Sequence, residues 1–545
     1  MKTSASTKSR GRKAGRAALM GALASIALAL SACGGAAPSA TTTTGSAKTP
    51  SGEVGETLTV QFLSSPISMD PAKTGIGPGQ IFVDLAYEPL IFKDPDGKYE
   101  PDLATEWKYT DSTNTGFSLT LREGVTFADG TPLDNQAVAK SIQYFKDAKG
   151  PQSGDLAALT SIDTAEANKI SLKFSAPTPN LEQVFSQVGL AGQIINPSAL
   201  SNPKSLESST AGAGQYVLNT STTVNGQKYV FDANPKYWNQ EAIHYKHVVI
   251  QSIAEPNAIL SAARTGQIDV ALSGTSTTAA AAKSAGLEVV AAPYTWSGLL
   301  LLDRDGTLAP QLGDQRVRQA INYAIDRDAI RKAIIGEYGG TTDQVLSPSM
   351  PGSLDDMTYS FDLDKAKSLM QEAGYADGFA LTVSDTTLLD PNTALGQALA
   401  TQLGKIGIKI TIDNAPTIQQ FRGDLMNKKY AATVWSPLAG IGMAQFASTY
   451  MAPNTTFNPF GAKDEQVTSA LNEAAATTDP AARDAALKRA QERVLDLAWF
   501  APVYWSQELL YVGPKVANVR ISEHNNLPNP VAPTKDGGWQ PAATK

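Results

Sequence analysis

The side chains best suited to covalent or metal chemistry are scarce in this 545-residue chain. It has three histidines, His244, His247 and His524, and a single cysteine, Cys33. His244 and His247 stand three residues apart at the start of an expected strand, where that spacing turns them to opposite faces. We therefore expect both to be exposed or packing side chains, and we predict no metal site and no cofactor.

Motifs of known catalytic chemistry are also missing from the sequence. It contains no GxSxG nucleophile elbow, no HExxH zinc motif, no P-loop and no GxGxxG that follows a strand. The glycine-rich residues 211–214 precede a strand-like run. A turn therefore fits them better than a phosphate-binding loop, which needs a helix after it. Carboxylates are too numerous to single out an acid–base pair, so the sequence gives no specific support for an enzyme and we expect none.

Large aromatic side chains are the better candidates for a binding site. Trp296, Trp435, Tyr504 and Trp505 lie near the ends of expected strands, next to turn or small residues such as Ser436. Ligand sites of α/β folds gather at strand ends, and these side chains offer a broad apolar face with one polar group. Packing in the core is the competing interpretation for each of them.

A glycine-rich loop is the second candidate for ligand contact. Residues 74–80 read Thr-Gly-Ile-Gly-Pro-Gly-Gln, and we assign Ile76 and Gly77 to the predicted site. An ordinary surface loop is the alternative for this segment.

Alternating strands and helices are expected to position these residues. Strand-like runs occur at residues 57–63, 118–121, 170–174, 229–231, 248–253, 287–290, 299–302, 380–383, 408–412 and 432–435. Helical patterns occur at residues 136–148, 257–265, 363–373, 395–405, 467–474 and 482–497, and the strongest covers 315–335, with Asp314 as its N-cap. This alternation over hundreds of residues predicts an α/β fold.

The N-terminus has the pattern of an export signal. Six basic residues and no acid precede an uncharged apolar run of 14 residues, 17–30, which is shorter than the roughly 20 that a spanning helix needs. Leu30-Ser31-Ala32-Cys33 resembles the bacterial lipobox. We therefore expect cleavage after residue 32 and a diacylglyceryl group on Cys33, which anchors the protein outside the cytoplasm, on the outer face of the cell membrane. A free thiol after an ordinary signal peptide is the alternative.

The residues after Cys33 suggest a tether followed by an acidic body. Residues 33–55 are of low complexity and form an expected flexible tether with a reach of about 25 Å. Removal of residues 1–32 takes six of the 45 Lys and Arg residues and none of the 52 Asp and Glu residues, which leaves a net charge of −13. This charge argues against nucleic acid as a partner.

An ordered series of short motifs extends from residue 57 to 520. It includes YEPL at 87–90, LREGVTF at 121–127, DGTPL at 129–133, GAGQY at 212–216, NPKYW at 234–238, RVRQAINYAIDR at 316–327 and PVYW at 502–505. The series resembles the extracytoplasmic solute-binding proteins of family 5, the peptide, nickel and oligosaccharide receptors of ABC importers.

The resemblance implies a two-lobed periplasmic-binding-protein-like fold of the large cluster C type. Lobe I would comprise residues 56–88, 205–296 and 500–545, with an extra subdomain at 89–204, and lobe II would comprise residues 297–499. A small organic or oligopeptide-like ligand would bind between the lobes of a monomer, which delivers it to an ABC permease. The other possibilities are a tethered extracellular hydrolase and a signalling receptor on the same scaffold.

One segment departs from the family pattern. Peptide receptors of this family often carry, near the late tryptophan, an Asp that pairs with the peptide amino group, but residues 434–443 contain no acid. A buried ammonium without a partner is costly. Recognition of a free amine would therefore need another acid, and the small apolar residues present here suit a less charged or aromatic ligand.

Overall fold

The computed structural model describes residues 45–77, 79–348, 350–386, 393–438, 442–521 and 528–543. Residues 40–545 form one compact unit, separate from residues 1–39, and the fold reported below is that of this unit. The predicted signal peptide and the predicted lipidation residue Cys33 lie outside the described residues. Among the described helices, none is both long enough and apolar enough to cross a bilayer.

The largest sheet in the described chain has eleven strands. Their order is β15-β14-β16-β12-β17-β11-β1-β10-β9-β8, and β13 pairs with β17. The strands are β1 (Gly55–Phe62), β8 (Tyr216–Leu218), β9 (Lys228–Ala233), β10 (Tyr245–Ser252), β11 (Val270–Gly274), β12 (Glu288–Leu301), β13 (Gly339–Thr341), β14 (Phe379–Asp385), β15 (Ile408–Asn414), β16 (Ala432–Trp435) and β17 (Phe500–Val512).

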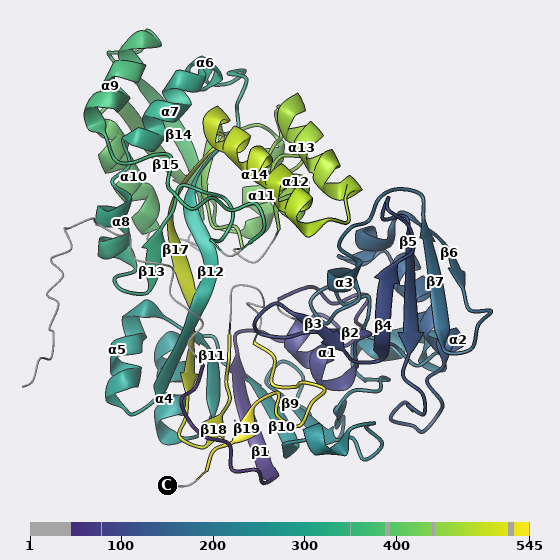
Figure 1. The fold of residues 1–545 in the computed structure, drawn as a ribbon. Coiled ribbons are helices and arrows are strands. Elements are labelled where there is room, and N and C mark those ends of the chain that lie inside the picture. Colours follow the sequence, from purple (N-terminus) through teal and green to yellow (C-terminus); the bar gives the residue numbers. More distant parts are fainter. Residues whose placement is uncertain are drawn as a thin grey trace, which may run out of the picture. The chain divides into compact units, whose positions relative to one another are not determined.

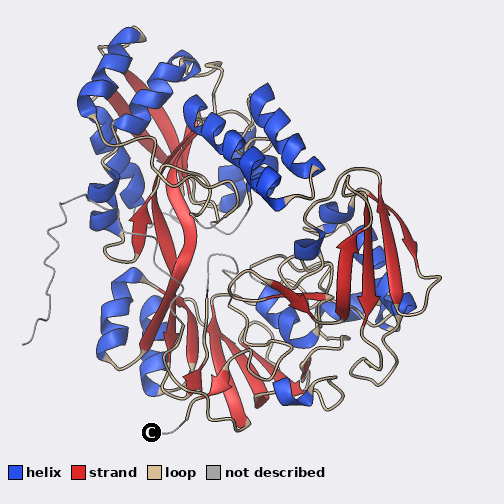
Figure 2. Ribbon diagram, in the orientation of Figure 1, coloured by secondary structure: helices blue, strands red, loops and turns tan. Residues whose placement is uncertain are grey.

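Smaller sheets and many helices complete the fold. The smaller sheets are β4 (Ala104–Tyr109), β5 (Gly116–Leu121), β7 (Lys169–Phe174) and β6 (Leu159–Asp163), then β2 (Ile91–Lys93) with β3 (Tyr99–Pro101), and β18 (Val516–Ala517) with β19 (Gln540–Pro541). The helices are α1 (Gln80–Ala86), α2 (Asn135–Asp147), α3 (Leu181–Val184), α4 (Pro256–Thr265), α5 (Ser276–Ser284), α6 (Pro310–Gly313), α7 (Gln315–Tyr323), α8 (Arg327–Ile334), α9 (Leu363–Glu372), α10 (Ala394–Gly404), α11 (Ile418–Met426), α12 (Met443–Tyr450), α13 (Glu465–Ala476) and α14 (Pro480–Leu497). This is the mixed α/β composition that the sequence predicts (Figure 2).

Helices cover both faces of the sheet around β12, β14 and β16. Leu300 of β12 faces α11–α14 in what we call the second core, whereas Leu299 and Leu301 face α7–α10 in the third core (Figure 1). Successive strand residues point to opposite faces, so an unbroken apolar run suits a strand that is covered on both sides. Such a run is visible at residues 299–302 of the sequence.

A separate core lies at the other end of the same long strands. This first core combines β1, β10 and α1 with the four-stranded sheet β4-β5-β7-β6, and it includes Val290 of β12 and Leu510 of β17. The strands β12 and β17 thus run from the first core to the second and third cores. The lobe and subdomain boundaries given above stay a prediction.

The strand β12 differs from the prediction, which places two strands at 287–290 and 299–302. Pro293 and Gly298 divide the sequence pattern, but the structure has one 14-residue strand, Glu288–Leu301. Its pairing with β17 shifts register between Pro293 and Thr295 and again between Ser297 and Gly298. Bulges of this kind let a strand bend without ending.

The predicted helix at 315–335 is wrong as a single element. The chain forms α7 and α8, because Asp326 caps the second helix by accepting a hydrogen bond from the Ala329 N–H. Arg327 then turns inward and donates hydrogen bonds to the carbonyls of Asn322, Thr342, Tyr359 and Pro502. A buried guanidinium needs such acceptors, so this arginine joins the two helices to β17 and serves the fold.

The tether prediction for residues 33–55 needs a correction over its last part. Ser46 Oγ and the Ala47 N–H donate to the Glu288 carboxylate, and the Lys48 ammonium lies 3.1 Å from it. Lys48 Nζ also donates to the Gly513 carbonyl at 2.8 Å. Polar contacts to the first residue of β12 and the loop after β17 therefore hold residues 46–48 on the body, although the low-complexity sequence offers almost no apolar side chains for burial.

Candidate functional site

Three of the predicted aromatic residues meet on neighbouring strands. In the antiparallel register, Trp296 of β12 lies opposite Trp505 of β17, and Gly298 lies opposite Trp435 of β16. All three indoles belong to the second core. Tyr504 is directed into the third core, on the other face of the sheet.

Trp435 lies at the edge of this aromatic cluster. Its ring stacks on Phe421, with centroids 4.9 Å apart and an interplanar angle of 14°, and it lies 5.0 Å from Phe457. The indole N–H donates to the Tyr450 hydroxyl at 3.4 Å. The neighbouring Ser436 is only partly buried, and its hydroxyl lies 2.8 Å from the hydroxyl of Ser297.

Trp296 is a fully buried core residue in this structure. Its exposed fraction is 0%, and the ring meets Phe500 edge-on with a centroid distance of 6.3 Å. The indole N–H has no hydrogen-bond partner among the described residues. Trp505 and Tyr504 are also buried, so ligand contact by these three side chains stays a prediction.

The predicted loop at residues 74–80 leads into α1. Ile76 and Gly77 are partly exposed, and Ile76 packs against the first core. Gly77 has φ = +95°, a left-handed conformation that disfavours any other residue. The buried side chains of Thr74 and Gln80 have no hydrogen-bond partner among the described residues, so polar groups are available at both ends of the loop.

A hollow of about 440 Å³ separates the β2–β3 hairpin and α3 from α12–α14. Its walls are mainly apolar, with Tyr99 and Pro179 on one side and Met350, Met443, Leu471 and Leu487 on the other. The two sides also meet directly, because Asn114 Nδ2 donates to the carbonyls of Ala475 at 3.0 Å and Thr477 at 3.3 Å. Pockets of this size and character suit small organic ligands.

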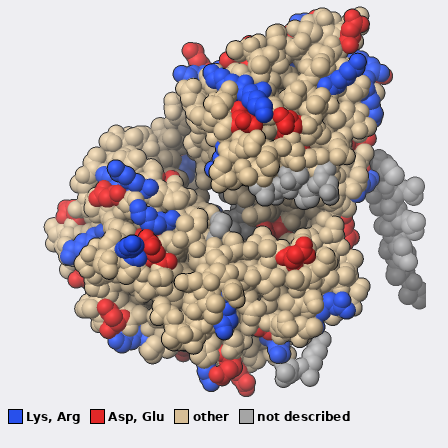
Figure 3. Space-filling model, turned by 180° about the vertical axis from the view of Figure 1, so that it is seen from behind, with Lys and Arg blue, Asp and Glu red and all other residues tan. Residues whose placement is uncertain are grey.

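Four of the residues that line this hollow are charged, namely Lys93, Asp96, Glu182 and Arg483. Burial lowers the pKa of the Lys93 ammonium to about 8, and this ammonium lies 5.7 Å from the centre of the Tyr99 ring. Burial raises the pKa of the Glu182 carboxyl, and the charge of Arg483 partly opposes that shift. On the face that Figure 3 shows, charged side chains of both signs lie scattered.

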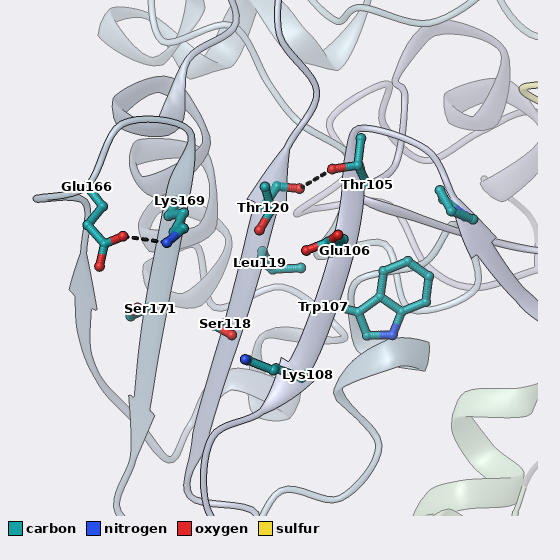
Figure 4. Close-up of a pocket in the computed structure, with 11 residues that line it drawn as sticks. Thr105, Glu106, Trp107, Lys108, Ser118, Leu119, Thr120, Glu166, Lys169 and Ser171 are labelled. Atoms are coloured by element: carbon teal, nitrogen blue, oxygen red, sulfur yellow. Dashed lines mark hydrogen bonds and ion pairs between the residues drawn. The ribbon is translucent and has the colours of Figure 1, made fainter.

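A second concave region, of about 660 Å³, lies on the four-stranded sheet and has a different character (Figure 4). Its lining is mainly polar, with the charged residues Glu106, Lys108, Glu166 and Lys169. Lys169 pairs with Glu166, and the Thr105 hydroxyl donates to the Thr120 carbonyl. Ion pairs on an exposed sheet face are typical of a solvated surface. We therefore do not place the ligand there.

The sequence analysis missed one residue at the crossing strands, Glu508 of β17. It is partly exposed, and no described residue forms a hydrogen bond or an ion pair with its carboxyl group. Burial raises the pKa of this carboxyl to about 8. The available signal was composition, since Glu508 is the only charged residue of the run 500–512.

The two histidines that the structure describes have surroundings typical of packing or partly exposed side chains. His244 Nε2 lies 2.9 Å from the Gly537 carbonyl, and His247 Nδ1 lies 2.7 Å from an Asp232 carboxylate oxygen. His524 lies outside the described residues. Within the part of the chain that the structure describes, no group of three or more His, Cys, Asp or Glu residues could hold a metal ion.

Known proteins share both the sequence pattern and this architecture. Residues 98–460 match the family described as bacterial extracellular solute-binding proteins, family 5 Middle. The glutathione-binding protein GsiB of Salmonella paratyphi A is 26% identical over 445 residues, which cover 79% of this chain and 85% of that protein.

Solved structures agree with the predicted fold class. HbpA2 from Haemophilus parasuis has a TM-score of 0.75 and 19% identity, over 90% of this chain and 100% of that one. DppA from Helicobacter pylori, solved with the peptide STSA, has a TM-score of 0.72 and 20% identity, over 90% and 99%. These likenesses confirm the two-lobed, periplasmic-binding-protein-like α/β fold.

Proposed function

The chain belongs to family 5 of the bacterial extracellular solute-binding proteins, and from that premise we propose that it captures a small organic ligand for an ABC permease in the membrane. The family and the relatives are substrate-binding transport proteins, so the solute-binding role itself follows from membership. The observation that carries the ligand class is the apolar hollow between the β2–β3 hairpin and α12–α14.

The ligand is proposed to carry a sizeable apolar part. Met443, Leu471 and Leu487 offer apolar surface in the hollow, and no acid occurs in the segment around Trp435. Peptide-like ligands remain within the proposal, since GsiB is named for glutathione and DppA was solved with a peptide. None of the residues that the sequence marks lines this hollow, and contact of the ligand with Trp435, Ser436, Trp296, Tyr504, Trp505, Ile76 and Gly77 is a separate part of the proposal.

Closure of the two lobes is proposed to accompany binding. The strands β12 and β17 run through the cores at both ends of the molecule, so bending at their bulges would move one end against the other. Solute then shifts an open–closed equilibrium by binding the closed form more tightly.

Identification of the bound solute is the decisive test. We expect native mass spectrometry of the purified protein to show a solute of low mass that denaturation releases. Addition of that solute to stripped protein should change the tryptophan fluorescence and raise Tm. A protein that holds no solute, and that shows neither response to extracts of growth medium, would contradict the proposal.

The lipid anchor and the location also belong to the proposal. Cys33 is proposed to carry a diacylglyceryl group, because one acyl chain binds a bilayer only marginally whereas two hold it firmly. The protein would then sit as a monomer on the outer face of the cell membrane. Cys33→Ala should move the protein from the membrane fraction to the soluble fraction with solute binding intact, and loss of binding in that soluble form would contradict this assignment.

Two alternative functions, those of a tethered hydrolase and of a signalling receptor, can each be distinguished from solute import by one observation. A tethered hydrolase would turn over a glycan or peptide substrate, and one carboxylate substitution would abolish that turnover. A signalling receptor would bind solute normally but would leave solute uptake unchanged when its gene is deleted.

A further inference from the structure

Glu508 lies where the two long strands pass between the cores. Toward one end of β17, Leu510 packs in the first core, and toward the other, Trp505 packs in the second core. Between them, Ser506, Gln507 and Glu508 are only partly buried. We call these three residues the hinge segment of the proposed receptor. The segment is polar and partly exposed, whereas the residues on either side of it are apolar and buried.

The side of the sheet that Glu508 faces follows from its register. Glu508 lies opposite Ala292 of β12, and register partners in an antiparallel pair point to the same face. Ala292 belongs to the first core, against which Ile76 of the predicted ligand loop also packs. Glu508 is therefore on the face of the sheet that carries α1 and the loop before it.

Among the described residues, none forms an ion pair or a hydrogen bond with the Glu508 carboxyl group. Burial, followed by the charge of Glu508, raises the pKa of the Tyr294 phenol on β12. Buried carboxylates are rare unless they are paired. An acid without a partner among the described residues can form an ion pair with a cationic group of the ligand.

We propose that Glu508 is the acid that pairs with a cationic amine of the transported solute, in place of the acid that the segment around Trp435 lacks. This inference rests on the proposed function and narrows it to ligands that carry an ammonium or guanidinium group.

A proton should leave the site when such a ligand binds. With a pKa of about 8, Glu508 is roughly nine-tenths protonated at pH 7, and an approaching cation favours the ionised form. Binding at pH 7 would therefore release about 0.9 proton per site, whereas at pH 9 the release would be small.

Matched probes with and without a charged amine can test the pairing. The pairs are 2-phenylethylamine, the peptide Ala-Phe-Ala and glutathione, each compared with its N-acetylated form, which removes the cation and keeps the rest. Titration calorimetry at pH 7 in phosphate and in Tris, which differ in ionisation enthalpy, gives affinity and proton release together. The variant is Glu508→Gln, and the control is Glu288→Gln, the only other acid of this strand pair, which already pairs with Lys48.

We expect at least one amine to bind the wild type and the Glu288→Gln control about tenfold or more tightly than its acetylated form. In Glu508→Gln that preference should fall to about twofold or less, and the proton release should vanish. Equal binding of acetylated probes, or an amine preference that survives Glu508→Gln, would overturn the inference.

Failure of the inference can be told apart from failure of the proposed receptor role. If no probe of either kind binds, or if the solute released from the purified protein carries no basic group, the assignment of Glu508 is wrong while solute binding stands. If the purified protein also holds no solute at all, the receptor role is contradicted as well.

Discussion

Two acids in this molecule, the buried Glu88 and the partly exposed Glu508, differ in their surroundings. Glu88, in the first core, accepts hydrogen bonds from the Tyr237 hydroxyl and from the Trp238 indole N–H at 3.3 Å, and the Arg122 guanidinium stacks on Trp238 at 3.9 Å. Glu508, between the cores, has no such partners among the described residues. Burial raises the pKa of both carboxyls, so the pKa alone does not separate them.

The hydrogen-bond partners of each acid indicate its role. Glu88 joins the YEPL segment to the NPKYW segment, and every donor it meets comes from the fold itself. Its role is structural, and the two motifs are explained by it. Glu508 joins nothing that the structure describes, which leaves its carboxyl group available to a ligand.

The largest expected effect is that of Glu88→Ala. The Tyr237 hydroxyl and the Trp238 N–H would lose their common acceptor in a buried site, at a cost of about 1–3 kcal/mol each. We expect the free energy of unfolding to fall by about 2–5 kcal/mol in urea denaturation. Glu88→Gln, which keeps an acceptor oxygen, is the control and should lose about 1 kcal/mol. Equal losses in both variants would show that the hydrogen bonds are not what Glu88 contributes.

Glu508→Gln should raise the free energy of unfolding at alkaline pH, whereas Glu88→Ala should lower it. The folded pKa of about 8 lies above the ordinary value of 4.5, so the wild type loses stability as the pH rises from about 4.5 to about 8. The glutamine variant lacks this loss. Without ligand, we expect it to match the wild type near pH 4.5 and to exceed it by about 1–3 kcal/mol at pH 8.5, a range that allows for the partial exposure of the residue. If the free energies of unfolding of the variant and the wild type differed by the same amount at every pH in this range, ionisation of Glu508 would not affect stability. The contrast with Glu88 would then be wrong.

The smallest effect is expected for Glu288→Ala at the edge of the sheet. Glu288 is a third kind of acid. Burial would raise its pKa, but hydrogen bonds from Ser46 and Ala47, together with the Lys48 ammonium, hold that pKa below the ordinary value. A surface pair of this kind contributes about 1 kcal/mol or less. We expect almost unchanged Tm but faster proteolysis after Lys48, because residues 46–48 would leave the body. Unchanged cleavage would show that the other contacts of this segment suffice.

Much of the fold was predictable because it depends on local pattern. The strands at 408–412 and 432–435 and the helices at 257–265 and 363–373 agree with the structure to within three residues, since hydrophobic period and caps decide such elements. The helix at 315–335 was not predictable in detail. Asp326 offers a local signal for the N-cap of the second helix, but the inward turn of Arg327 depends on acceptors as far away in the chain as Pro502.

The candidate site was predictable only in part. The sequence marked Trp296, Trp435 and Trp505, and the strands do bring them together, but as a buried cluster. It did not mark Glu508, because an acid in a strand is ordinary until its neighbours are known. A sequence shows the type of a side chain, whereas only packing shows whether that side chain has a partner.

The amino-acid sequence by itself determined the class of the protein, because an ordered series of motifs and a strand–helix alternation do not depend on long-range contacts. It also determined the candidate anchor at Cys33, a local pattern that lies outside the described residues. The tertiary structure alone decided that residues 46–48 are held against Glu288, that β12 and β17 link the cores, and that Glu508 lies there with no hydrogen-bond or ion-pair partner among the described residues. Each of these depends on residues far apart in the chain, whose meeting is set by the packing of the whole molecule.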